Sequence, residues 1–197
     1  MNQLTPQRTA FLDRDGVLVE DIDWLSHPDQ IRIFPGVPEA LVRLVQAGFQ
    51  LIVVTNQPIV ARGLITEEQL QTIHLALAEK LAAAGAPLLT HIYYCPHHPK
   101  ATLPAYRLDC LCRKPKPGLL LRAATDLGLD PAAGFMVGDR MSDIAAGAAA
   151  GCRTILVQTG KHLEAPIQTS TPVDPLLKPD WTCADLPAAV QWIIDYK

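Results

Sequence analysis

The sequence of 197 residues has no long apolar run and no excess of basic residues. No apolar stretch approaches the ~20 residues that a helix needs to cross a bilayer, so we expect no membrane partner. The 17 Lys and Arg residues are outnumbered by 20 Asp and Glu residues, which gives a net charge of -3. Domains that bind nucleic acids usually carry a clustered basic excess, so this balance argues against a nucleic-acid partner.

The chain also begins without the features of a secretory signal. Residues Met1 to Pro6 have neither a basic start nor an apolar core, and we therefore expect a cytoplasmic protein. Five cysteines in that compartment are typical of thiols or metal ligands rather than disulfides, and their odd number points the same way. We expect Cys152 and Cys183 to be packing residues.

Short apolar runs alternate with helix patterns along the chain. The runs, typical of strands buried on both faces, lie at residues 10–12, 51–54, 135–137 and 154–157. The helix patterns, each followed by a glycine, lie at residues 37–47, 67–84, 117–127 and 142–150. This alternation favours an α/β fold, a Rossmann-like three-layer sandwich with a mainly parallel sheet, in a single domain over residues 1–197. We expect the Pro- and Thr-rich stretch 164–179 to be a surface excursion, and the middle of the chain to be irregular.

Two carboxylates follow the first apolar run. If that run is a buried strand, Asp13 and Asp15 leave its carboxyl end together and can share a divalent cation. A carboxylate that attacks a phosphate monoester must overcome the repulsion between two anions, and Mg²⁺ between them removes most of that penalty. In α/β sheets, ligands bind beyond the carboxyl ends of the strands.

Polar or charged residues stand at three other boundaries of apolar runs or helices, namely Thr55–Gln57, Arg113–Lys114 and Asp139–Asp143. Each segment alone is equally consistent with a turn or a helix cap. Their joint occurrence indicates one phosphoryl-transfer site, in which cations before a helix amino terminus bind an anion and further carboxylates complete a metal site.

A second metal signal lies in the middle of the chain. Cys95, His97, Cys110 and Cys112 offer three thiolates and an imidazole, a set suited to tetrahedral Zn²⁺, with free thiols as the alternative. Four protein ligands leave no open position for water, so we expect a structural zinc that orders a loop at about residues 94–112. We expect His98 to be merely adjacent.

The motifs resemble those of the haloacid dehalogenase-like phosphohydrolases. Within that family they are most similar to the branch of the D-glycero-D-manno-heptose 1,7-bisphosphate phosphatases, which includes histidinol-phosphate phosphatase domains. The resemblance extends over nearly the whole chain. It rests on residues 13–16, 55–57, 61–63, 93–99, 110–115 and 137–139.

The resemblance implies a role for each matching residue. Asp13 would be the nucleophile that forms an aspartyl-phosphate, and Asp15 would protonate the departing sugar oxygen and then activate water. Thr55 and Lys114 would stabilise the transferring phosphoryl group. The implied ligands of Mg²⁺ are Asp13, the main-chain carbonyl of Asp15, and Asp139, with Asp143 in a supporting role.

The implied substrate is a small sugar phosphate, heptose 1,7-bisphosphate, which loses one phosphate to a monomeric enzyme. Arg113 stands at the matching position for substrate recognition. The other residues expected to contact the substrate are Asp21, Ile22, Asp23, Trp24, Asn56, Gln57, Pro58 and Arg140. At Pro58 and Ile59 this chain departs from the small residues that are typical of the branch. This departure concerns the identity of the sugar in the substrate rather than the type of reaction.

Three alternatives stay open from the sequence. A histidinol-phosphate phosphatase shares these motifs, and a polynucleotide 3′-phosphatase uses a similar Thr-Asn-Gln segment. A zinc-knuckle binding module without enzymatic activity would need the Cys and His residues but not Asp13, Asp15 or Asp139.

Overall fold

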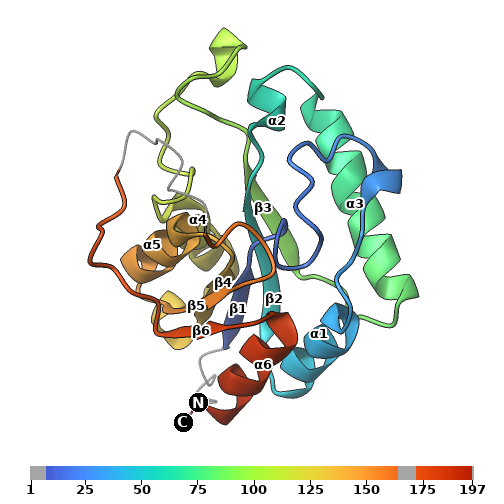
Figure 1. Cartoon of the computed structure of the whole chain (residues 1–197), viewed down its shortest axis with the longest axis vertical. Helices are drawn as coiled ribbons and strands as arrows, with labels where there is room; N and C mark the ends of the chain where they lie inside the picture. The colour runs from blue at the N-terminus through green and yellow to red at the C-terminus, as the bar shows by residue number, and fades with distance from the viewer. Residues whose placement is uncertain (1–7, 164–171, 197) are drawn as a thin grey trace.

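Six parallel strands form one sheet between two layers of helices in the computed structural model, which describes residues 8–163 and 172–196 (Figure 1). The order across the sheet is β3-β2-β1-β4-β5-β6. The strands are β1 (Thr9–Leu12), β2 (Gln50–Asn56), β3 (His91–Cys95), β4 (Phe135–Gly138), β5 (Arg153–Val157) and β6 (Trp181–Cys183). The four expected strands are confirmed, whereas β3 and β6 were not anticipated.

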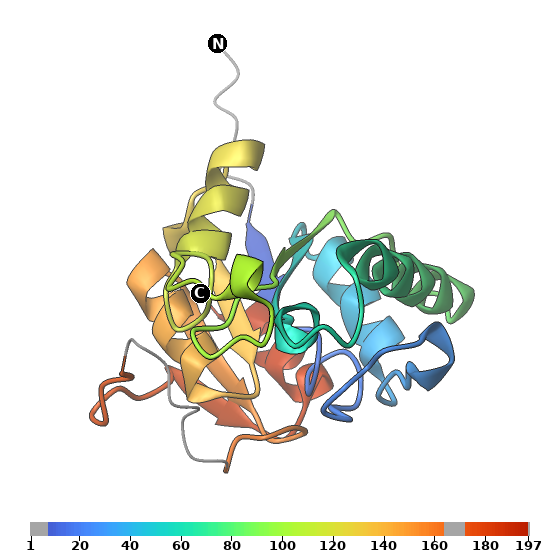
Figure 2. The same cartoon turned by 90° about the horizontal axis from the view of Figure 1, so that it is seen from above.

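The helices lie on both faces of the sheet, as seen from above in Figure 2. One face is covered by α1 (Val37–Gln46), α3 (Glu67–Ala83) and α6 (Leu186–Asp195). The other face is covered by α4 (Gly118–Leu127) and α5 (Met141–Ala150), and α2 (Pro58–Ala61) is a single short turn after β2. Short 3-10 helices lie at Pro28–Gln30, Pro104–Tyr106 and Pro131–Ala133. The expected three-layer α/β sandwich is therefore confirmed.

The central strands are apolar throughout because each of their faces meets a helix layer. On β1, the side chains of Ala10 and Leu12 pack in the core beneath α1, α3 and α6, whereas Phe11 packs on the opposite side beneath α4 and α5. All three are fully buried. This burial on both faces explains why the strand reads as a continuous apolar run rather than an alternating one.

The helix ends follow their sequence signals with one correction. Thr66 and Gln69 form the expected capping box of α3. Pro117, expected in the first turn of its helix, is instead the N-cap, and α4 begins at Gly118. A Cβ at Gly118 would lie 2.3 Å from the carbonyl oxygen of Leu111, so only glycine lets the preceding loop pack so closely on this helix.

Two further expectations concern segments outside the regular elements. The surface excursion at 164–179 lies partly outside the described residues, and its described part, 172–179, contains no helix or strand. No helix within the described ranges is long and apolar enough to cross a membrane.

Candidate functional site

Three buried carboxylates converge at the carboxyl edge of the sheet. Asp13 follows β1, Asp139 follows the neighbouring β4, and Asp143 lies in the first turn of α5. An oxygen from each lies within 4.8 Å of an oxygen from the others. A Cβ at Gly138 would lie 2.2 Å from the Cβ of Asp143, so glycine is required for α5 to bring this carboxylate in.

The electrostatics of these carboxylates fit a divalent cation. Burial and then the charges of Asp143 and Asp13 raise the pKa of Asp139 to about 8. Burial, opposed by Lys114, raises the pKa of Asp13 to about 6. Asp139 Oδ1 is buried without a hydrogen-bond partner among the described residues, while its Oδ2 accepts from the Lys161 amide at 2.7 Å. Three crowded hard oxygens, one of them unsatisfied, are a donor set that Mg²⁺ would suit.

A fully buried lysine stands between two of the carboxylates. The Nζ atom of Lys114 lies 3.1 Å from Asp13 Oδ1 and 2.6 Å from Asp143 Oδ1, and it donates to the Val54 carbonyl at 2.7 Å. Burial alone would lower the pKa of Lys114, but the two carboxylates outweigh it and raise the pKa. The site therefore holds a fixed positive charge beside Asp13.

Asn56 holds this lysine in place. Its Nδ2 donates to the Lys114 carbonyl and its Oδ1 accepts from the Lys114 amide, both at 3.1 Å. The amide group that we expected to contact substrate is thus engaged with the main chain of Lys114. The neighbouring Thr55 lines the cavity, and its Oγ1 accepts from Gln57 Nε2 at 2.9 Å, which leaves the hydroxyl proton free to be donated to a ligand.

Asp15 lies outside the three-carboxylate cluster and is held by a side chain that the sequence interpretation missed. Arg14 donates from Nε and Nη2 to the two oxygens of Asp15 at 2.9 and 2.8 Å, and Nη2 also donates to Gln57 Oε1 at 2.9 Å. Gln57 Nε2 donates to Asp15 Oδ2 at 2.8 Å. A two-pronged guanidinium contact fixes the plane of a carboxylate as well as its position. Arg14 is only 1 % exposed, so it is an orienting residue rather than a surface charge.

A cavity of about 290 Å³ opens over these residues. Of the residues expected to contact substrate, Ile22 is not part of the lining and is 39 % exposed. Arg62 and His98 line the cavity as well, although neither was assigned a role from the sequence. The other expected residues that line it are Asp21, Asp23, Trp24, Asn56, Gln57, Pro58, Arg113 and Arg140.

Ion pairs tie one wall of the cavity together. Arg140 Nη2 lies 3.2 Å from Asp21 Oδ2, and Lys161 Nζ lies 3.4 Å from the same oxygen. Lys161 also pairs with Asp23, which has a positive φ of 65°. These contacts fix the segment after β1 against the loops after β4 and β5. Because each of these cations faces a carboxylate, the charges on this wall largely compensate one another.

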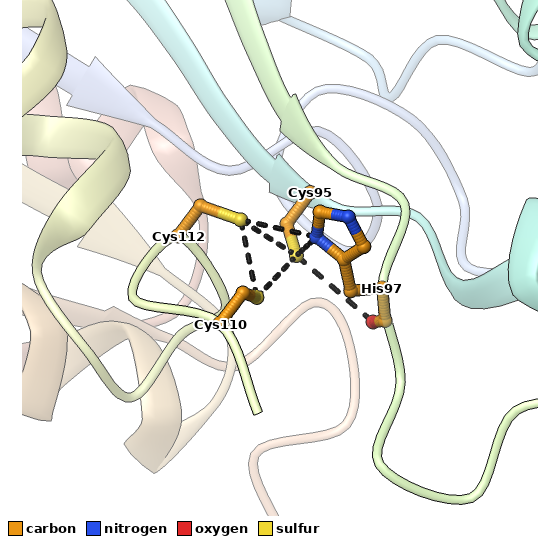
Figure 3. A group of neighbouring side chains, drawn as sticks. All are labelled: Cys95, His97, Cys110 and Cys112. Atoms are coloured by element: carbon orange, nitrogen blue, oxygen red, sulfur yellow. Dashed lines mark hydrogen bonds between the residues drawn. The ribbon is translucent and has the colours of Figure 1, made fainter. Parts of the chain in front are cut away.

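The three sulfurs and the His97 ring converge beyond the end of β3, as Figure 3 shows. Cys112 Sγ lies 3.3 Å from Cys95 Sγ, 3.1 Å from Cys110 Sγ and 3.4 Å from His97 Nδ1, while Cys95 Sγ lies 3.5 Å from Cys110 Sγ. Ligands around a tetrahedral zinc at usual bond lengths would lie roughly 3.5–3.8 Å apart. The separations quoted above lie at or slightly below this range, so the four residues are compatible with Zn²⁺. None of these cysteines forms a disulfide.

His98 and the other two cysteines lie outside this cluster. His98 Nδ1 accepts from the Lys100 amide at 3.0 Å, and His98 is not among the converging ligands. Cys152 is buried in the core beneath α4 and α5, and Cys183 packs against the core on the other side. The packing roles expected for both cysteines are confirmed.

Comparison with known proteins places these features in context. A family model described as HAD-hydrolase-like matches residues 111–189. A D-glycero-beta-D-manno-heptose-1,7-bisphosphate 7-phosphatase of Salmonella typhi is 40 % identical over 185 residues, which cover 92 % of this chain and 94 % of the relative. A protein of the same description from Yersinia pestis is 39 % identical over 195 residues, with 97 % and 98 % covered.

Solved structures give a matching result. The D,D-heptose 1,7-bisphosphate phosphatase from B. bronchiseptica, complexed with magnesium and phosphate, superposes with a TM-score of 0.80 at 34 % identity. The match covers 96 % of this chain and 99 % of that one.

Proposed function

This chain belongs to the D-glycero-beta-D-manno-heptose-1,7-bisphosphate 7-phosphatase family of haloacid dehalogenase-like hydrolases, and we propose that it removes the phosphate at position 7 of that bisphosphate. The observation that carries the proposal is the convergence of the Asp13, Asp139 and Asp143 carboxylates, of which Asp13 and Asp143 pair with Lys114 and line the cavity with it. A binding module built on the zinc cluster alone would not need this arrangement.

In the proposed reaction Asp13 attacks the phosphorus atom. Its Oδ1 accepts from the Arg14 amide at 2.7 Å and faces Lys114 Nζ, which leaves Oδ2 as the nucleophilic atom. The bond from Oδ2 to phosphorus forms as the bond from phosphorus to the sugar oxygen breaks. Lys114 and the Thr55 hydroxyl stabilise the charge on the phosphoryl oxygens.

Asp15 moves the proton in both half-reactions. It gives a proton to the departing sugar oxygen, and it then takes one from the water that hydrolyses the aspartyl-phosphate. Mg²⁺, when bound, would neutralise charge between Asp13 and the phosphate. Its proposed ligands are Asp13, Asp139 and the main-chain carbonyl of Asp15, with Asp143 in support. We propose that Zn²⁺ has a structural role and is bound by Cys95, His97, Cys110 and Cys112. The monomeric state and the cytoplasmic location remain predictions from the sequence.

A comparison of three substrates tests the proposed function. We expect kcat/KM for heptose 1,7-bisphosphate to exceed that for histidinol phosphate and for a 3′-phosphorylated oligonucleotide by ~10²-fold or more, because the relatives that this chain matches are described as phosphatases of the first substrate. Phosphate release is measured for each under the same Mg²⁺ concentration. Equal or faster turnover of histidinol phosphate or the oligonucleotide would reject the assigned substrate while keeping the reaction class.

Substitution of Arg14 by Lys tests how Asp15 is held. A lysine keeps the positive charge but cannot form the bidentate hydrogen bonds to both carboxylate oxygens, so Asp15 should lose its orientation. We expect kcat for the sugar phosphate to fall by ~10²-fold, since small errors in position cost about that much. p-Nitrophenyl phosphate should lose much less, because its leaving group needs little help from an acid.

The matched control is Arg153→Lys, which alters an arginine at the far end of the sheet that pairs with Asp180. This variant should keep the wild-type kcat for both the sugar phosphate and p-nitrophenyl phosphate. An equal fall for both substrates in Arg14→Lys would show that the loss does not run through protonation of the departing sugar oxygen by Asp15.

A further inference from the structure

Most cations that line the cavity are already paired with carboxylates. Lys114 pairs with Asp13 and Asp143, and Arg140 and Lys161 both pair with Asp21. Arg62 and Arg113 line the same cavity, yet neither forms an ion pair with any carboxylate in residues 8–163 and 172–196. The cavity therefore has a balanced part around Asp13 and a part with two positive charges in excess.

Arg113 is a desolvated cation in this second part. It is only 7 % exposed, its Nη1 donates to the His97 carbonyl at 3.1 Å, and its buried Nε has no hydrogen-bond partner among the described residues. Holding such a guanidinium away from water without a counter-ion is unfavourable, so an arriving anion would find a strong partner here.

Arg62 is held over the cavity by its neighbours rather than by a carboxylate. It is the C-cap of α2, and its guanidinium carbon lies 4.8 Å from the centre of the Trp24 ring. The amide of Leu103 donates to the Ala61 carbonyl at 3.0 Å, which ties the end of α2 to the loop between Cys95 and Cys110. Figure 1 shows this loop beside α2, so the loop that carries the zinc ligands positions both arginines.

His98 adds a neutral donor to the same part of the cavity. Because its Nδ1 accepts from the Lys100 amide, the proton resides on Nε2.

Arg113 stands at the position to which the family resemblance assigns substrate recognition. We propose that Arg62, which lines the same part of the cavity, binds the phosphate that is not transferred and is a specificity-determining residue for bisphosphates. Two guanidinium groups match the charge of about −2 on a phosphate monoester near neutral pH. The inference rests on the proposed function. It adds a residue, Arg62, to which the motifs assign no role.

Arg62→Gln tests the proposal. With heptose 1,7-bisphosphate we expect kcat/KM to fall by ~10–50-fold, mostly through KM, as one charged hydrogen-bonding partner is lost. With heptose 7-phosphate, which lacks the second phosphate, kcat/KM should stay within about twofold of the wild type. Arg122→Gln, at a position with a 71 % exposed side chain outside the cavity, is the control and should alter neither value. Zinc content and Tm of each variant are measured alongside.

The outcomes separate this proposal from the proposed function. An equal loss with both substrates, or no loss with the bisphosphate, would overturn the role of Arg62. If the wild type hydrolyses neither heptose phosphate, the assigned substrate fails. Arg62 can then be tested independently with p-nitrophenyl phosphate as the substrate and fructose 1,6-bisphosphate or fructose 6-phosphate as the inhibitor. If the ratio of the two inhibition constants is unchanged in Arg62→Gln, the role of Arg62 in binding a second phosphate is overturned.

Discussion

Replacing Asp13 by Asn should reduce phosphate release by ~10⁴-fold or more, because an amide cannot form the covalent bond to phosphorus. The protein should nevertheless stay folded. Burial and neighbouring carboxylates raise the pKa of Asp13 to about 6, so its ionised form is disfavoured by its surroundings, and a neutral side chain of the same shape relieves that repulsion. Lys114 keeps Asp143 as a partner at 2.6 Å. We expect Tm to be unchanged or slightly raised, and zinc content to be unaffected.

The measurements for this variant are Mg²⁺-dependent phosphate release, Tm and metal content. Asp126→Asn is a matched control, since Asp126 lies at the surface beside Arg122 and should give wild-type activity. Acid quenching followed by mass measurement should detect a phosphorylated enzyme in the wild type and none in Asp13→Asn. Full residual activity in the variant would remove Asp13 from the mechanism.

The site was predictable from the sequence to the extent that it lies at strand ends. Parallel strands bring their carboxyl ends to one edge, so polar residues that follow separate apolar runs meet without any knowledge of the loops. Asp13 and Asp139 meet in this way. Asp143 serves both predicted purposes, because its Oδ2 caps α5 by accepting from the Arg140 amide at 3.0 Å while the carboxylate faces Lys114.

Residues that act through three-dimensional contacts were harder to predict. Arg14 sits between two acidic residues, and sequence alone does not show whether such an arginine points to solvent or inward. Its burial depends on Gln57, which lies 43 positions after Arg14 and 42 positions after Asp15 and bonds to both side chains. Arg62 likewise follows a four-residue helix that has no periodicity to read, and its partner Trp24 comes from a distant loop.

The missed elements of the fold have two different causes. The edge strands β3 and β6 are only partly buried, so they lack the continuous apolar run by which the central strands were recognised. The helix α6 did carry a readable signal. Asp185 caps it by accepting from the Ala188 amide at 2.9 Å, and Leu186, Val190 and Ile193 lie on its buried face at helical spacing.

Loss of the zinc cluster should have the second largest effect. In Cys110→Ser one of three sulfur ligands is replaced by a poor ligand, and we expect zinc content to fall below about 0.2 equivalents. The loop from Cys95 to Cys112 contains only one short 3-10 helix, so metal binding would supply most of the free energy that orders it. A loss of about 3 kcal/mol would lower Tm by roughly 6–12 °C in a chain of this size.

The control for this variant is Cys183→Ser, which changes a half-buried cysteine outside the cluster and should keep a full zinc equivalent. Retention of a full equivalent by Cys110→Ser would reject the ligand assignment.

Activity should fall in Cys110→Ser even though no zinc ligand belongs to the three-carboxylate cluster. Arg113 and Lys114 follow Cys112 directly, and Arg113 is anchored to the His97 carbonyl. Lys114, in contrast, keeps its contacts with Asn56 and Val54, which come from β2 and not from the loop. We therefore expect the kcat/KM for the bisphosphate to fall more than that for p-nitrophenyl phosphate. A uniform loss for both substrates would mean that the zinc loop supports Lys114 as much as Arg113.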